Sequence, residues 1–206
     1  MPRKTDKRIR LIEAAMVLIH QHGFNLTTLA YIAQEADVPL GNVYYYFKTK
    51  EAIGEAVIER HAAWYTERLS KLNDITEPMM RLFAFMEYTP EELDRTARYG
   101  CAIGGLCQEL GKQGGSLADQ AAKLLHDVVE WSAAQFKTLG FTGEAANDLA
   151  MHYIAAIQGM HLLTHTFKDP KITHRESSVI KAWLKQLKPV TDKSMASHKT
   201  LEDAVV

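Results

Sequence analysis

The chain has 206 residues, of which 47% are apolar and 24% charged, a composition typical of a folded protein with a sizeable core. Its two cysteines, Cys101 and Cys107, are too few to cross-link a chain of this length, and their spacing matches no zinc motif. No apolar run reaches the roughly 18 residues that a membrane span needs. These observations exclude a disulfide scaffold and a membrane protein, and we expect a soluble, cytoplasmic protein without metal or cofactor.

The formal net charge of −1 is unevenly distributed. Residues 1–50 contain seven Lys and Arg against four Asp and Glu, a net charge of +3 that leaves −4 for the remainder. A basic segment on a nearly neutral chain is typical of a DNA-binding module attached to another domain. We therefore expect double-stranded DNA as a partner.

The first 50 residues show the pattern of three helices. Apolar residues spaced by three and four predict a helix over 6–22, ended by Gly23. A short helix over 29–36 follows, and a third begins at Pro39 and reaches residue 47. Two short helices joined by a tight turn constitute a helix-turn-helix.

Longer helices are predicted beyond this segment. Thr49 caps the first of them, and the pattern continues over residues 51–72, 77–87, 101–112, 117–139, 144–167 and 174–187. No strand-like alternation or internal repeat is present. We predict an all-α fold with an N-terminal three-helix helix-turn-helix DNA-binding domain (1–50), a C-terminal helical ligand-binding and dimerisation domain (51–190) and a mobile tail (191–206).

The second helix of a helix-turn-helix lies in the major groove, so its exposed side chains contact base edges. Gly41 permits close approach to the duplex, Asn42 offers a donor and an acceptor, and Lys48 can neutralise phosphate. An aromatic core cluster is the simpler interpretation of residues 44–47 taken alone. The residues expected to contact DNA are Thr27, Thr28, Tyr31, Pro39, Leu40, Gly41, Asn42, Tyr44, Tyr45, Lys48 and Lys50.

Residues 9–55 contain Gly23-Phe24, Thr27-Thr28, Ile32-Ala33, Ala36, Val38, Gly41 and the run Tyr44-Tyr45-Tyr46-Phe47-Lys48-Thr49-Lys50-Glu51-Ala52. With these residues the segment resembles the tetracycline-repressor (TetR-like) family. Leu29-Ala30-Tyr31 departs from the family's usual pattern, and residues 100–110 resemble a Gly-Cys-x-x-Gly-x-Leu-x-x-Glu-Leu motif of one sub-group. The resemblance implies a homodimeric repressor that a small-molecule effector, bound in the helical body, releases from a palindromic operator.

Two further sets of residues are candidates within the body. Large apolar side chains with a few polar tips are typical of a pocket between helices, although a plain core explains each of them equally well. The pocket candidates are Trp64, Met86, Tyr88, Cys101, Cys107, Trp131, Met151, Tyr153, Met160 and His161. Small residues that allow close helix approach and an apolar last helix give the candidates for the dimer interface: Ala155, Ala156, Gly159, Val179, Ile180, Trp183, Leu184 and Leu187.

Two alternatives remain open at this point. One is a helix-turn-helix regulator with no small effector, and the other is an all-α enzyme. The chain contains no nucleophile-elbow, phosphate-loop or zinc-protease motif, and the spacing of Glu109, His126 and Glu130 positions no acid–base pair. His161 and His165 have a zinc-like spacing but lack further ligands. We therefore expect no catalytic residues.

Overall fold

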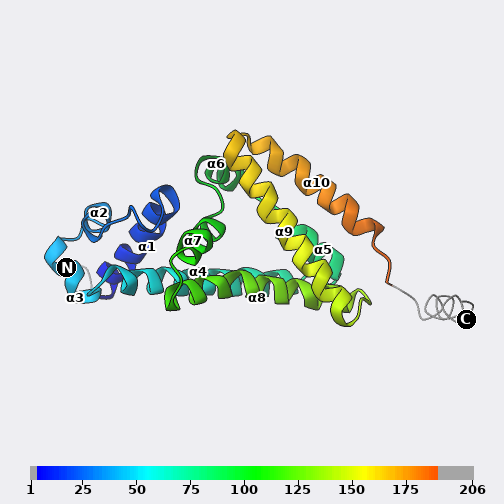
Figure 1. Cartoon of the computed structure of the whole chain (residues 1–206), viewed down its shortest axis with the longest axis horizontal. Helices are drawn as coiled ribbons and strands as arrows, with labels where there is room; N and C mark the ends of the chain where they lie inside the picture. Colours follow the sequence, from blue (N-terminus) through cyan, green and yellow to red (C-terminus); the bar gives the residue numbers. More distant parts are fainter. Residues whose placement is uncertain (1–3, 190–206) are drawn as a thin grey trace, which may run out of the picture.

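The computed structural model describes residues 4–189, and this part of the chain contains helices and no strand, as the all-α prediction requires. Figure 1 shows α4 and α8 packed side by side along the long axis, with the first three helices at one end and α10 lying along α9. The tail expected at 191–206 lies outside the described residues. The helices are α1 (Lys4–His22), α2 (Leu29–Glu35), α3 (Leu40–Tyr46), α4 (Lys50–Asn73), α5 (Pro78–Phe85), α6 (Pro90–Tyr99), α7 (Ala102–Gly111), α8 (Ser116–Thr138), α9 (Gly143–Phe167) and α10 (Pro170–Gln186).

Local caps and turns fix the first three helices. The Thr28 hydroxyl accepts a hydrogen bond from the Tyr31 N–H (3.2 Å) at the start of α2, and Pro39 precedes α3. The turn between α2 and α3 passes through Asp37, whose φ of 48° is left-handed. Arg10 of α1 braces this turn, because its guanidinium donates to the Asp37 carbonyl (2.9 Å) and to that of Ala36.

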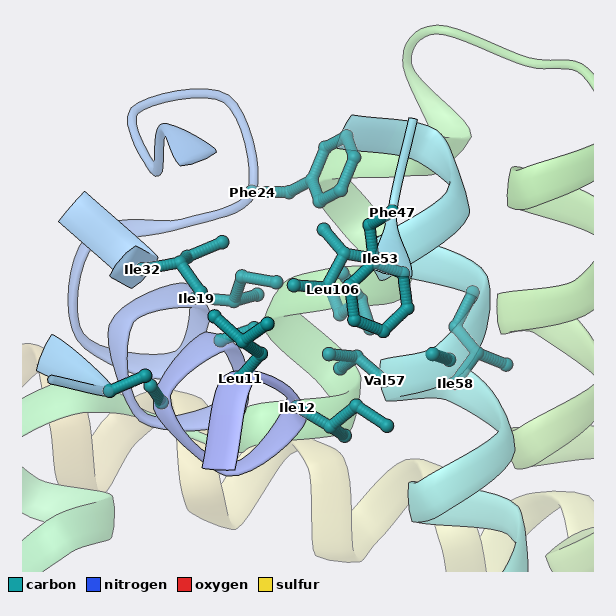
Figure 2. Packing of buried hydrophobic residues seen from close by; sticks show 14 of the residues in the cluster. Leu11, Ile12, Ile19, Phe24, Ile32, Phe47, Ile53, Val57, Ile58 and Leu106 are labelled. Atoms are coloured by element: carbon teal, nitrogen blue, oxygen red, sulfur yellow. The ribbon is translucent and has the colours of Figure 1, made fainter. Parts of the chain in front are cut away.

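The core around α1, α2 and α3 extends into the body. Its apolar cluster includes Leu11 and Ile32, Ile53 and Val57 of the first turns of α4, and Leu106 of α7. Figure 2 shows Leu106 lying between the α1 side chains and those of α4. The cluster is therefore continuous across residue 50, and a domain boundary there remains a prediction.

A second apolar cluster holds the far end of the molecule together. It is formed by α5, α8, α9 and α10 around Tyr153 and Phe136, both of which are fully buried. The Tyr153 hydroxyl donates a hydrogen bond to the Leu82 carbonyl (2.6 Å). This bond replaces the hydrogen bond to water that the hydroxyl loses on burial. These contacts fix α9 and α10 relative to α8.

Two stretches of helix were not predicted from the sequence. The first is α6, which carries few apolar residues, but Thr89 and Glu92 form a capping box and Pro90 occupies its first turn. The second is the first turn of α10, which begins at Pro170 behind the Asp169 cap rather than at residue 174. Both starts are encoded in cap residues rather than in apolar periodicity. No helix within residues 4–189 is long and apolar enough to cross a membrane.

Candidate DNA-reading surface and effector cavity

The two sides of α3 have different environments. Val43 and the following Phe47 are buried against the first core, at 0% and 3% exposure. Tyr44 and Tyr45 are 47% and 63% exposed, and a Cβ added at Gly41 would meet no atom within 4 Å. The exposed side of α3 thus presents phenol hydroxyls and an open backbone to solvent.

The neighbouring candidates extend this exposed side, which we call the reading surface. Asn42 is partly exposed, and most of the others are exposed. Tyr31 of α2 is 58% exposed, and the partly exposed Leu40 (43%) faces solvent rather than the core. The reading surface consists of Thr28, Tyr31, Pro39, Leu40, Gly41, Asn42, Tyr44, Tyr45 and Lys48.

Thr27 and Lys50, which were expected to contact DNA, are held by contacts with other parts of the protein. Thr27 is 2% exposed, and its hydroxyl donates to the Gly23 carbonyl (2.7 Å). The Lys50 ammonium donates to the Asn25 carbonyl (2.8 Å) and lies 4.7 Å from the centre of the Phe24 ring, and burial lowers its pKa. Both side chains hold the turn between α1 and α2, so we remove them from the reading surface.

Glu109 of α7 binds the backbone of the same turn from the side of the body. Its two carboxylate oxygens accept the backbone N–H groups of Phe24 (2.6 Å) and Asn25 (2.7 Å). Gly23, with φ +84°, fits beneath this carboxylate, because a Cβ there would lie 2.8 Å from Oε2. Gln113 adds a hydrogen bond to the Asn25 side chain (2.6 Å). We call these contacts the Glu109 clamp.

A cavity of about 420 Å³ lies between α1, which together with α2 and α3 forms what we call the reading head, and the helices of the body from α4 to α9. We call its buried apolar lining the floor and its exposed lining residues, such as Val17 and Arg95, the mouth. Its lining comes from seven helices and from Tyr88 in the loop after α5. It consists of Met16, Val17, His20 and Gln21 of α1, His61, Trp64, Tyr65 and Arg68 of α4, Phe85 of α5, Tyr88, Glu92, Arg95, Thr96 and Tyr99 of α6, Ala102 and Ile103 of α7, Leu125 and Val128 of α8, and Ile154, Ile157, Gln158 and His161 of α9.

Trp64, Tyr88 and His161 are the sequence candidates that line this cavity. Met86, Tyr153 and Met160 instead belong to the second core, and Met151 is 59% exposed on α9. Trp131 donates its indole N–H to the Asn73 side chain (2.9 Å). Large apolar residues therefore predicted the cavity lining poorly, because most of them are packed in the core.

The two cysteines also lie outside the cavity lining. The Cys101 sulfur caps α7 by accepting the Gly104 N–H (3.3 Å), and the Cys107 thiol donates to the Ala121 carbonyl (3.1 Å). Burial raises the pKa of both thiols, that of Cys107 to about 11, so both are protonated at neutral pH.

Burial keeps the histidines of the cavity neutral. It lowers the pKa of His61 and of His161 to about 4 and also lowers that of His20, whose ring bonds the Gly100 carbonyl (2.9 Å). Nε2 of His161 lies 3.1 Å from the Tyr88 hydroxyl, whereas its buried Nδ1 has no hydrogen-bond partner within residues 4–189. A protonated His161 would carry an N–H at Nδ1 with no acceptor. The missing acceptor and the burial therefore both lower the pKa of His161.

The dimer candidates divide between the surface and the core. Ala155 and Val179 are exposed, whereas Ile180 and Leu184 are 6% and 0% exposed inside the second core. Ala156, Gly159, Trp183 and Leu187 are partly buried. Ile180 and Leu184 therefore stabilise the subunit itself and offer no surface to a partner.

Possible metal ligands come together at one place in the described chain. Side-chain atoms of His126, Asp127 and Glu130 lie within 4.8 Å of one another on α8, where His126 and Glu130 are exposed. Asp127 also accepts a hydrogen bond from Lys123 (2.7 Å), so surface ion pairing accounts for this group. His165, which has a zinc-like spacing from His161 in the sequence, bonds the Ala97 carbonyl (3.3 Å).

The reading surface and the cavity together define a helical regulator with a helix-turn-helix. Residues 11–57 match the family described as bacterial regulatory proteins, tetR family, and residues 78–175 match the C-terminal domain of LmrA/YxaF-like transcriptional regulators. The chain belongs to the tetR family of bacterial regulatory proteins. This confirms the resemblance noted in its sequence.

Two curated relatives match part of the chain. The HTH-type transcriptional repressor NemR of Escherichia coli is 33% identical over 108 residues, which cover 52% of this chain and 54% of NemR. The transcriptional regulator AcuR of Cereibacter sphaeroides is 30% identical over 145 residues, or 67% of this chain and 64% of AcuR. The chain thus spans about half the length of NemR and just under two thirds of AcuR.

Solved structures share the fold over nearly their full length. A TetR transcriptional regulator from Legionella pneumophila superposes with a TM-score of 0.76 at 22% identity, covering 88% of this chain and 97% of that one. The reduced form of E. coli NemR gives a TM-score of 0.72 at 24% identity, covering 85% and 96%. These likenesses confirm the helix-turn-helix fold with a helical C-terminal domain.

Proposed function

We propose that the chain is a homodimeric transcriptional repressor that binds a palindromic DNA operator and is released from it by a small-molecule effector. The observation that carries the proposal is the two-sided α3, which buries Val43 and exposes Tyr44 and Tyr45 on a basic segment of the chain. A helix of this kind enters the major groove in helix-turn-helix proteins. The relative NemR is named a transcriptional repressor, which supports the direction of regulation.

An exposed apolar stripe supports the homodimer. Met151, Ala155 and Leu162 recur on one side of α9 at spacings of four and seven, and Met151 and Leu162 are 59% and 56% exposed. Val179 of α10 adds another exposed apolar side chain (59%). Two copies joined through this stripe would form a four-helix interface and would present two reading surfaces.

The cavity supports an effector rather than a regulator without one. Its volume lies within the ordinary range for small-molecule sites, and its apolar floor carries a few polar groups. The relatives are transcriptional regulators, and we propose a cytoplasmic regulator without catalytic activity.

The test is binding of full-length protein to labelled duplexes that carry the promoter next to its own gene, with random duplex as competitor at stated salt. The triple variant Asn42→Ala/Tyr44→Ala/Lys48→Ala should lose specific binding while keeping its helical circular dichroism. The control, Lys137→Ala, removes an exposed lysine of α8 and should bind as the parent does. Unchanged specific binding by the triple variant would refute the proposed reading surface. If no promoter duplex binds, selection of bound genomic fragments decides whether an operator exists.

A further inference from the structure

The charged groups of the cavity are of both signs, and one of them is unpaired. Arg68, Glu92 and Arg95 line it. The Arg68 guanidinium lies 3.8 Å from the Glu92 carboxylate, so these two charges compensate each other. Arg95 is exposed and has no carboxylate partner within residues 4–189. With its histidines neutral, the cavity has an excess positive charge.

The positions that suit a cation are already filled by the protein's own Arg68. Its guanidinium lies 5.3 Å from the centre of the Trp64 ring and 5.7 Å from that of Phe85. It also donates to the carbonyls of Phe85 (3.1 Å) and Glu87 (3.3 Å). The aromatic faces and the carboxylate that would attract a cationic ligand are therefore occupied.

The unpaired Arg95 stands at the mouth among hydrogen-bonding groups. Thr96 and Tyr99 of α6 and His20 of α1 line the same cavity, and the His20 and Tyr99 rings lie 5.7 Å apart between their centres. The floor includes the apolar side chains of Ile157 and Val128, which are 2% and 3% exposed. A bound molecule is thus offered positive charge at one end and hydrocarbon at the other.

We propose that the effector is a small apolar or aromatic carboxylate whose acid group binds Arg95 at the mouth and whose body fills the floor. This inference rests on the proposed function, because it names the chemistry of the effector that the repressor binds. A carboxylate is favoured over a neutral group since it gains a charge-assisted hydrogen bond from Arg95 without displacing Arg68.

The histidines add a dependence on pH. His61 of α4 faces His20, and His20 in turn faces Arg95 and Tyr99 of α6 and His165 of α9. Burial holds the pKa of both below the ordinary value, and the nearby Arg95 lowers that of His20 further. A carboxylate bound at Arg95 raises the pKa of the neighbouring His20, so binding takes up protons there and its affinity increases as pH falls from about 8 to about 6, whereas His61, with a pKa of about 4, stays neutral. Arg95 and an aromatic carboxylate stay charged over that range.

The experiment compares isosteric probes by titration calorimetry on the full-length protein without DNA. The probes are 2-naphthoate, neutral 2-naphthamide and cationic 2-naphthylmethylamine. We expect 2-naphthoate to bind about tenfold more tightly than the amide, with the amine weakest. Arg95→Gln should abolish the preference for naphthoate. The matched control Arg98→Gln should retain it, because Arg98 is exposed on α6 and pairs with Asp94 rather than lining the cavity.

Each outcome decides the proposal. Equal or tighter binding of the amide or the amine by the parent protein overturns it, as does absence of binding of all three probes. A preference that survives Arg95→Gln overturns the role of Arg95. Because the titration needs no DNA, a protein that prefers naphthoate through Arg95 but binds no operator would refute the proposed function and leave the ligand chemistry intact.

Discussion

The Glu109 clamp ties the reading head to the body, and its removal should cost both stability and operator affinity. In Glu109→Ala the N–H groups of Phe24 and Asn25 lose their carboxylate acceptor. A hydrogen bond to a charged group contributes about 1.5–3 kcal/mol. The Phe24 N–H is partly buried whereas that of Asn25 is exposed and regains water, so we expect a loss of about 3 kcal/mol rather than twice that amount.

Such a loss is readily measured by thermal unfolding. For a chain of this length, about 3 kcal/mol corresponds to a decrease in Tm of about 6–12 °C. Circular dichroism at fixed protein concentration gives this value, since the Tm of a dimer depends on concentration. Operator affinity should decrease as well, because the released turn joins α1 to α2.

Two variants separate the clamp from general effects of losing a glutamate. Glu59→Ala removes an exposed carboxylate of α4 that accepts no hydrogen bond within residues 4–189, and should change Tm by less than about 2 °C. Glu109→Gln keeps one acceptor but turns an amide N–H toward the second donor, so it should behave nearly as badly as the alanine variant. A Glu109→Ala protein no less stable than Glu59→Ala would refute the reasoning.

Three further predictions concern the core, the dimer and the DNA contact. Tyr153→Phe should destabilise the protein by about 1–2 kcal/mol in urea unfolding, because the buried Leu82 carbonyl loses its donor; an unchanged midpoint would contradict this. Met151→Glu, on the exposed stripe of α9, should convert the dimer to a monomer in analytical ultracentrifugation. The control Lys137→Glu, at an exposed position of α8, should leave the dimer intact. Lys48→Ala should weaken binding to all duplexes alike and reduce the salt slope by about one, and a selective loss at the operator would assign Lys48 to base contact.

Helix positions were predictable wherever apolar periodicity and glycine punctuation are strong. The helices expected at 117–139 and 144–167 are found at Ser116–Thr138 and Gly143–Phe167. Helix α6 was missed because Leu93 and Ala97 are too few to give it an apolar periodicity. The Thr89–Glu92 capping box is the feature of its sequence that indicates a helix start. Periodicity reports the face that a helix buries, so a short polar helix is invisible to it.

The reading surface was largely predictable because it is built from one short segment. Within it the two adjacent threonines differ in role: Thr28 caps α2, whereas Thr27 turns inward to the Gly23 carbonyl. Residue type cannot distinguish them, since both positions tolerate a hydroxyl that bonds the local backbone. The division depends on which side of the chain meets α1 and α7, and this is a tertiary property.

The cavity could not be predicted, because no segment of the chain contains it. Its polar residues lie singly on different helices, for example His20 on α1, His61 on α4 and Arg95 on α6. Each of them, taken alone, is indistinguishable from a solvated residue on a helix face. Only the packing of those helices makes their side chains converge, so large apolar residues drew the prediction to the core instead.

The same packing places the cavity against the reading head itself. Met16 and His20 of α1 line the cavity, while Leu11 and Ile19 of the same helix pack in the core that carries α2 and α3. Figure 1 shows α7 running between this end of the molecule and the body. Its first turn contributes Ile103 to the cavity wall, and two turns later its Glu109 carboxylate holds the turn before α2. A ligand in the cavity would therefore contact α1 and α7, and both helices pack in the core that carries α2 and α3.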